Sequence, residues 1–198
     1  MKVTNSILDG CLIIEPAVHS DHRGFFMETF HQERYKKMMG ITSPFVQDNL
    51  SRSSFGVLRG LHFQKNFPQG KLVRVLMGEI FDVAVDLRPD SKSYGHCDVI
   101  TLSDVNNLQF WIPEGFAHGF CTLTNDVVSN LPCQYVYPLQ DACLYHFQEN
   151  QRHYHSHEFQ LLHHLSKVPR HAVYLVLESK QHDLLKYCFQ SLKILDCC

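Results

Sequence analysis

The sequence predicts an all-β protein that folds as an antiparallel sandwich or barrel. Short apolar and β-branched runs recur between turn signals, at residues 11–16, 24–30, 71–87, 98–102 and 108–113. Glycines and prolines separate these runs, near Gly56, Gly70, Gly78, Pro89 and Pro113. Strands at this spacing are typical of antiparallel sheets that close on themselves or stack in pairs.

The clearest single strand covers residues 79–87, EIFDVAVDL. Side chains alternate between the two faces of a strand, so this segment separates two sets of residues. One face is apolar, with Phe81, Val83, Val85 and Leu87, and the other carries Ile80, Asp82, Ala84 and Asp86. The strand therefore brings two carboxylates to one face of a sheet.

Helices are expected in few places. Residues 31–40 read as a short helix that Gly40 ends as its C-cap. Residues 158–167 and 182–195 fit amphipathic helices, with a strand at 172–178 between them.

Composition limits the classes of protein. A chain of 198 residues holds one substantial domain, and its formal net charge of −2 comes from interspersed acidic and basic residues. This excludes the broad basic surface that binds nucleic acid or an anionic membrane. With no apolar run of about 18 residues and no signal-peptide pattern, we expect a cytoplasmic protein with reduced cysteines.

The composition changes near residue 125. All ten glycines lie between Gly10 and Gly119, whereas the region from Asn125 onward holds eight of the fourteen histidines and five of the eight cysteines. We therefore divide the chain into a β-sheet core at residues 1–125 and a divergent C-terminal region at residues 126–198.

Polar residues recur in or beside the strand-like segments: Arg23, Glu28, Gln47, Asn49, Arg59, His62, Lys71, Asp82 and His118. Each could be solvated or internally paired. Taken together they predict a cavity lined with polar groups, because a polar side chain inside a sandwich costs free energy unless it is used.

Two of these residues suggest a phosphorylated ligand. Arg23 and Arg59 both precede a glycine, which lets the backbone approach a ligand while the guanidinium offers two parallel hydrogen bonds to a phosphate.

His62 and Lys71 suggest proton abstraction. A histidine can accept a proton near neutral pH, and a lysine can stabilise negative charge that develops on an oxygen nearby. RGLHFQ, residues 59–64, has one histidine rather than the pair expected of a metal site, so we predict no metal at His62. His153, His155 and His157 occupy alternate positions and would share one face of a strand, so a metal site there stays open as an alternative.

The sequence resembles the dTDP-4-dehydrorhamnose 3,5-epimerase family, cupin-like jelly rolls that act on dTDP-sugars. The likeness covers residues 8 to about 123, through DHRGFFMETF, FVQDNLSRSSFGVLRGLHFQ, QGKLVRVLMGEIFDVAVDLR and FWIPEGFAHGF. It implies a homodimeric isomerase of dTDP-L-rhamnose biosynthesis with no metal or redox cofactor. Such enzymes remove protons from C5 and C3 of dTDP-4-dehydro-6-deoxy-D-glucose and return them to the opposite face.

The resemblance also implies roles for individual residues. His62 corresponds to the general base and Lys71 to the residue that holds the enolate oxygen. The nucleotide and sugar would be bound by Arg23, Glu28, Gln47, Asp48, Asn49, Arg59, Lys71 and His118.

The C-terminal region departs from the family pattern. The family's proton-donating tyrosine corresponds to Leu131, and Tyr135 and Tyr137 lie a few residues further on as substitute acids. The segment whose aspartate orients the histidine has no counterpart. Either the region diverged, or a shifted reading frame replaced it; the loss of glycine favours the shifted frame.

Three functions stay open at this point. The first is the 3,5-epimerase. The second is a single-site epimerase or ketoisomerase that acts on a related dTDP-keto sugar, and the third is a dTDP-sugar binding protein without catalysis.

Overall fold

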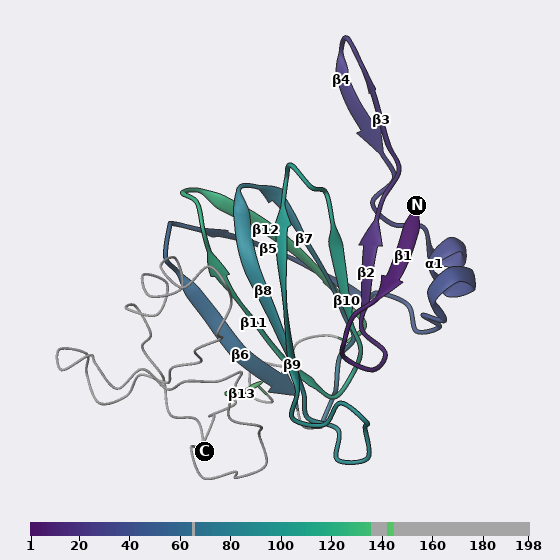
Figure 1. The fold of residues 1–198 in the computed structure, drawn as a ribbon, viewed down its shortest axis with the longest axis vertical. Helices are drawn as coiled ribbons and strands as arrows, with labels where there is room; N and C mark the ends of the chain where they lie inside the picture. The colour runs from purple at the N-terminus through teal and green to yellow at the C-terminus, as the bar shows by residue number, and fades with distance from the viewer. Residues whose placement is uncertain (65, 136–141, 145–198) are drawn as a thin grey trace, which may run out of the picture.

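The computed structural model describes residues 1–64, 66–135 and 142–144, and these form two stacked antiparallel sheets with a projecting hairpin and one short helix (Figure 1). The prediction of an all-β sandwich is confirmed. Within the described part of the chain, no helix is long and apolar enough to cross a bilayer.

One sheet has six strands. Their order across the sheet is β1 (Lys2–Asn5), β2 (Leu12–Glu15), β10 (Gln109–Ile112), β7 (Lys71–Met77), β12 (Val127–Cys133) and β5 (Gln47–Ser53). Neighbours that are distant in sequence, such as β10 and β7, pair here, as the crossovers of a jelly roll require.

The second sheet has five strands. Their order is β13 (Ala142–Leu144), β6 (Leu58–Gln64), β11 (Phe116–Thr122), β8 (Glu79–Asp86) and β9 (Cys97–Ser103). β9 packs against β7 and β10 of the other sheet. At the opposite side of the sandwich, Arg59 of β6 donates from Nε to Ser53 Oγ of β5 at 3.1 Å.

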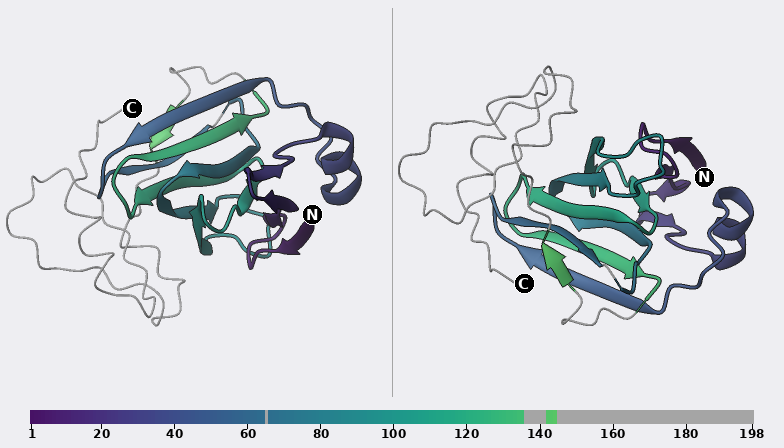
Figure 2. Two further views of the ribbon diagram at one scale, coloured as in Figure 1. Left: turned by 90° about the horizontal axis from the view of Figure 1, so that it is seen from above. Right: turned by 90° about the horizontal axis from the view of Figure 1, so that it is seen from below.

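The hairpin consists of β3 (Val18–Asp21) and β4 (Gly24–Met27) and projects well beyond the two sheets (Figure 1). Helix α1 (Gln32–Met39) follows it and lies to one side of the sheets (Figure 2). Gly40 ends the helix in the left-handed conformation, with φ of 69°, and its N–H donates to the Lys36 carbonyl at 3.0 Å. The predicted helix and its glycine C-cap are confirmed.

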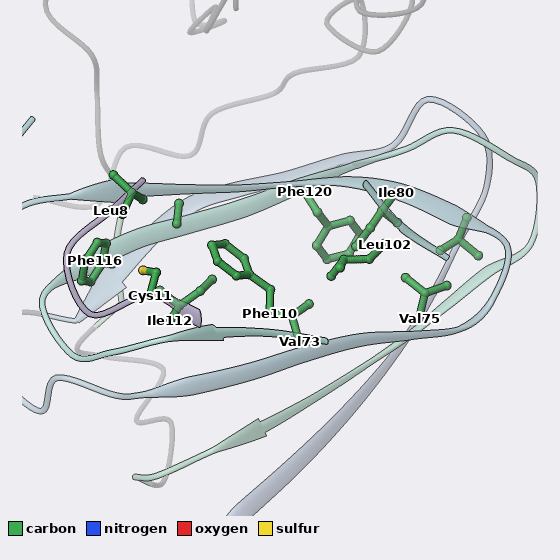
Figure 3. Packing of buried hydrophobic residues seen from close by; sticks show 12 residues of the cluster. Leu8, Cys11, Val73, Val75, Ile80, Leu102, Phe110, Ile112, Phe116 and Phe120 are labelled. Atoms are coloured by element: carbon green, nitrogen blue, oxygen red, sulfur yellow. The ribbon is translucent and has the colours of Figure 1, made fainter. Parts of the chain in front are cut away.

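Apolar side chains fill one part of the space between the sheets (Figure 3). At one end of this cluster lie Leu8, Cys11, Ile112 and Phe116, and at the other lie Val75, Ile80, Leu102 and Phe120, with Val73 and Phe110 between them. Burying a large apolar side chain contributes roughly 1.5–3 kcal/mol. This cluster is therefore the main source of folding stability.

The strand at residues 79–86 alternates as predicted. Its inner face is the one that carries the carboxylates: Ile80, Asp82, Ala84 and Asp86 are all 0% exposed. Asp86 has local partners, namely Arg88, Ser91 and Ser93. Asp82 lies deeper in the sandwich and contributes to the site described below.

The division proposed between residues 125 and 126 falls just before β12. This strand pairs with both β7 and β5 and so lies inside the six-stranded sheet. The described part of the sheet therefore continues to Cys133. The helices and the strand expected at residues 158–195, and His153, His155 and His157, lie outside the described residues.

Candidate active site

His62 and His118 lie side by side on β6 and β11, as directly opposite residues of the two strands. Lys71 begins β7 in the other sheet, where it is paired with Cys133 of β12, and it is only 6% exposed. The positive charge of Lys71 acts on His62 across the interior. The structure thus brings the expected base and the expected cation together from opposite sheets.

His118 has a close carboxylate partner. Its Nε2 lies 2.8 Å from Asp82 Oδ1, and both side chains are buried. The other oxygen, Asp82 Oδ2, has no hydrogen-bond partner within the part of the chain that the structure describes. Asp82 therefore orients His118 and leaves one buried acceptor in the site.

The surroundings of His62 favour a neutral imidazole. Burial, and then the positive charges of Lys71, His118 and Arg59, lower its pKa from 6.5 to about 4. Desolvation and nearby cations both disfavour the protonated ring. At neutral pH the ring is consequently unprotonated and able to accept a proton.

Lys71 and Asp82 are both buried and are ionisable groups of opposite sign. Burial lowers the pKa of Lys71, and the nearby Cys133 and Asp82 oppose this shift. Burial likewise raises the pKa of Asp82, and His118 and Lys71 oppose it. Each charge thus favours the ionised form of the other, but burial has the larger effect on both pKa values.

Polar side chains of β5 line the facing sheet. Gln47 Nε2 donates to Asn49 Oδ1 at 2.7 Å, and Asn49 Nδ2 donates to Cys133 Sγ at 3.5 Å. Asp48 differs from these two neighbours because it points to the opposite face of the strand. There it accepts a hydrogen bond from Asn130, which itself accepts one from Arg74 Nε at 2.7 Å. Of the three adjacent residues expected to bind substrate, the structure brings Gln47 and Asn49 to the interior and Asp48 to the outer face.

The structure gives a reason for the glycine at position 60 that the sequence did not indicate. Its φ is 112°, and a Cβ added there would lie 2.6 Å from the Cα of Gly119 on β11. The glycine therefore allows β6 and β11 to pack closely, and its expected role in the approach of a ligand stays a prediction.

Arg23 and Glu28 lie away from His62 within this chain. Arg23 is at the exposed turn of the β3–β4 hairpin, where it pairs with Asp21 at 2.6 Å. Glu28 follows the hairpin and pairs with Arg34 of α1, also at 2.6 Å.

Leu131 and the candidate acid Tyr135 lie in different surroundings. Leu131, at the position of the family's tyrosine, lies opposite Asn49 and packs against the apolar cluster. Tyr135 is 49% exposed just beyond β12, and its carbonyl accepts a hydrogen bond from Gln69 Nε2. Tyr137 lies outside the described residues.

The sequence prediction gave two residues of the site less than the structure shows: it assigned Asp82 no individual partner, and it did not single out Gln64. Asp82 was recognised as an inward-facing polar group but not as the partner of His118. Gln64, two residues after His62 on β6, faces the same side and is 7% exposed. The alternation of side chains along the strand could have identified it.

The described residues offer no cluster of metal ligands. Among residues 1–64, 66–135 and 142–144, no group of three or more His, Cys, Asp or Glu side chains is arranged to hold a metal ion.

Comparisons with known proteins identify the family. The family model described as dTDP-4-dehydrorhamnose 3,5-epimerase matches residues 5–165. The enzyme of that name from Methanothermobacter thermautotrophicus is 56% identical over 130 residues, which cover 66% of this chain and 70% of the relative.

Two solved structures are also similar. The epimerase RmlC from Legionella pneumophila, in complex with dTDP-4-keto-L-rhamnose, has a TM-score of 0.72 at 48% identity and covers 74% of this chain and 78% of its own. ChmJ, a 3'-monoepimerase from Streptomyces bikiniensis in complex with dTDP-quinovose, has a TM-score of 0.68 at 28% identity and covers 71% and 72%. The likeness confirms the cupin-like jelly roll, and the chain belongs to the dTDP-4-dehydrorhamnose 3,5-epimerase family.

Proposed function

We propose that this protein is a dTDP-4-dehydrorhamnose 3,5-epimerase of dTDP-L-rhamnose biosynthesis. One observation carries the proposal: the charge of the buried Lys71, on the opposite sheet, acts on His62 and helps to hold its pKa near 4. A neutral base beside a cation is the arrangement that proton removal next to a carbonyl needs.

In the proposed mechanism His62 takes the proton from C5 of dTDP-4-dehydro-6-deoxy-D-glucose. The electrons of the C–H bond move into the C4 carbonyl and form an enolate, and the ammonium of Lys71 stabilises its oxygen. An acid on the opposite side of the ring then protonates C5 and inverts it. The same steps at C3 complete the reaction.

The acid of this mechanism is proposed to be a tyrosine later in the chain than Leu131. Leu131 has no proton to donate, so we propose Tyr135 or Tyr137 in its place. Tyr135 follows β12 directly, at the end of the strand that carries Cys133 beside Lys71. A general acid contributes about a hundredfold to ten-thousandfold, so a misplaced acid would leave a slow enzyme.

For the remaining substrate contacts, we propose the residues that the resemblance implies. Arg59, Gln47, Asn49 and His118 lie around His62 or on the facing strand, which supports a nucleotide-sugar site between the sheets. Asp48 lies on the outer face of β5, and its contact with the substrate is proposed from the resemblance alone.

A homodimer accounts for the two residues that lie away from the site. Phe25 and Phe26 on the projecting hairpin are 61% and 74% exposed, and exposed apolar residues gathered on one element are typical of interaction surfaces. We propose that the hairpin packs against a second copy and presents Arg23 and Glu28 to the dTDP-sugar bound there. The proposal includes a cytoplasmic location, as expected from the composition, and the division at residue 125.

Solvent exchange tests the function. The full chain is incubated with dTDP-4-dehydro-6-deoxy-D-glucose in D2O, and deuterium at C3 and C5 is followed by NMR. Deuterium at both carbons supports the proposal. Deuterium at C3 alone would instead identify a single-site epimerase such as ChmJ, a 3'-monoepimerase. Tight binding without exchange would identify a binding protein.

A further inference from the structure

The amide of Gln64 is buried and has no hydrogen-bond partner among the described residues. The residue is 7% exposed, and neither Nε2 nor Oε1 has a partner within residues 1–64, 66–135 and 142–144. Leaving a buried amide unpaired destabilises a protein, so such groups are rare and need an explanation.

Gln109 shows what a structural glutamine looks like in this protein. It is 1% exposed, accepts a hydrogen bond from the Tyr35 hydroxyl at 2.7 Å, and donates to the Thr29 carbonyl at 2.8 Å. Both ends of its amide are satisfied. Gln64 is also buried and has no such bonds to any residue that the structure describes, which points to a ligand as its partner.

The position of Gln64 on β6 limits which part of a ligand it can reach. It shares a face with His62, and residues two apart on a strand are about 7 Å apart. Arg59 lies on the other side of His62, at the β5 side of the sandwich. A substrate whose phosphates contact Arg59 and whose ring lies over His62 therefore extends its far edge toward Gln64.

We infer that Gln64 binds the far edge of the keto sugar: Nε2 donates to the C4 oxygen, and Oε1 accepts from the C3 hydroxyl. The inference rests on the proposed function and names the feature of the substrate that the site selects. The thymine base is excluded as the partner because the diphosphate separates it from the sugar on the Arg59 side.

The chemistry of the two groups matches. An amide presents one donor and one acceptor side by side, and a ketone with a neighbouring hydroxyl presents an acceptor and a donor side by side. A sugar without the C3 hydroxyl leaves Oε1 buried and unpaired, and sites of this kind reject such analogues. Gln64 is therefore a specificity-determining residue for 3-hydroxy sugars.

Calorimetric titration tests this inference. dTDP-4-dehydro-6-deoxy-D-glucose and its 3-deoxy counterpart are each titrated into the full chain carrying His62→Asn, so that the sugars are not turned over. We expect the hydroxylated sugar to bind roughly threefold to tenfold more tightly, which is the effect of one hydrogen bond. Adding Gln64→Met should bring the ratio of the two affinities to about one, whereas Gln64→Glu, which keeps an acceptor, should preserve a preference.

Thermal stability separates this role from a structural one. Gln64→Met removes an unpaired buried amide, so Tm should hold or rise while the preference is lost. Gln109→Met is the matched control: it breaks two satisfied hydrogen bonds, so Tm should fall while the preference stays.

Two results would overturn the inference in distinguishable ways. If Gln64→Met keeps the full preference for the hydroxylated sugar, Gln64 does not bind it, although the proposed function stands. If neither sugar binds before Gln64 is changed, the proposed function itself fails, and the inference fails with it.

Discussion

The interior of the sandwich has two halves of opposite character. The apolar half, where β9 faces β7 and β10, is filled by side chains such as Phe110, Ile80 and Leu102, which are fully buried. The polar half, beside β5 and β6, contains His62, Gln64, Lys71, Asp82 and His118. Two of these, Gln64 and Asp82, have buried atoms without partners in the described structure.

The difference shows that the two halves have different roles, one in stability and the other in activity. Apolar burial stabilises the fold, whereas buried charges and unpaired amides destabilise it. The same two sheets extend across both halves, so the stability of one half compensates for the polar groups of the other. Substitutions should accordingly affect stability on one side and activity on the other.

Phe110→Ala should have the largest effect. It empties the centre of the apolar half, and such truncations reduce the free energy of unfolding by about 3–5 kcal/mol. Urea unfolding of the variant measures this. The affinity of the folded fraction for dTDP should stay the same, and a loss of affinity without a loss of stability would contradict the division into halves.

Lys71→Met, in the polar half, should reduce activity far more than stability. Removing one group that stabilises a developing oxyanion costs roughly a hundredfold to a thousandfold in rate. Because the lysine is buried and its pKa is lowered chiefly by burial, replacing it with an apolar residue of similar length removes the cost of burying an amine, and the free energy of unfolding should fall far less than in Phe110→Ala. Exchange rates and urea unfolding are measured on the same sample; a slow and strongly destabilised variant would show that Lys71 is structural.

Leu131→Tyr should increase activity. Leu131 lies opposite Asn49 at the place where the family has its acid, so a tyrosine there could protonate the enolate. We expect epimerisation to become roughly tenfold to a hundredfold faster, somewhat less than a fully placed acid gives. Leu131→Phe is the control, since it adds the ring without the hydroxyl; equal gains from both variants would exclude an acid role.

The smallest expected effect is on the stability of the fold at acid pH. It comes from Asp86, which lies outside the polar half. Burial opposes ionisation of Asp86, but hydrogen bonds from Arg88, Ser91 and Ser93 prevail and lower its pKa from 3.8 to about 2. A carboxylate with a lowered pKa stabilises the fold above its unfolded value and loses this effect as the pH falls through the folded value. We expect about 2 kcal/mol to be lost between pH 4 and pH 2, and Asp86→Asn to lack this component in urea unfolding at each pH.

The apolar half and the helix could be predicted from sequence because their signals are local. Alternation along residues 79–86 and the glycine after α1 each depend on a few adjacent residues. β12 was harder to predict because polar residues interrupt it. Ser129 is buried against Ser51, with 2.8 Å between the hydroxyls, and Asn130 is buried between Arg74 and Asp48.

The site was predicted in part. His62, Lys71 and His118 stood in long motifs, so the resemblance identified them, whereas the pairing of His118 with Asp82 depends on the register of β8 and β11. The outward position of Asp48 follows from alternation between Gln47 and Asn49 and could have been predicted. The distance of Arg23 from His62 could not, because it depends on how far the hairpin projects.

The pH dependence of exchange tests the central claim, that His62 is a base kept neutral by burial and by the cations around it. The rate of deuterium incorporation at C5 is measured as kcat/KM from pH 3.5 to 8, for the wild-type chain and for His62→Asn. Since the base must be unprotonated, the wild-type rate should rise with pH through about 4 and then level off, and the variant should show no exchange. A rise centred near 6.5, or undiminished exchange in the variant, would contradict the account.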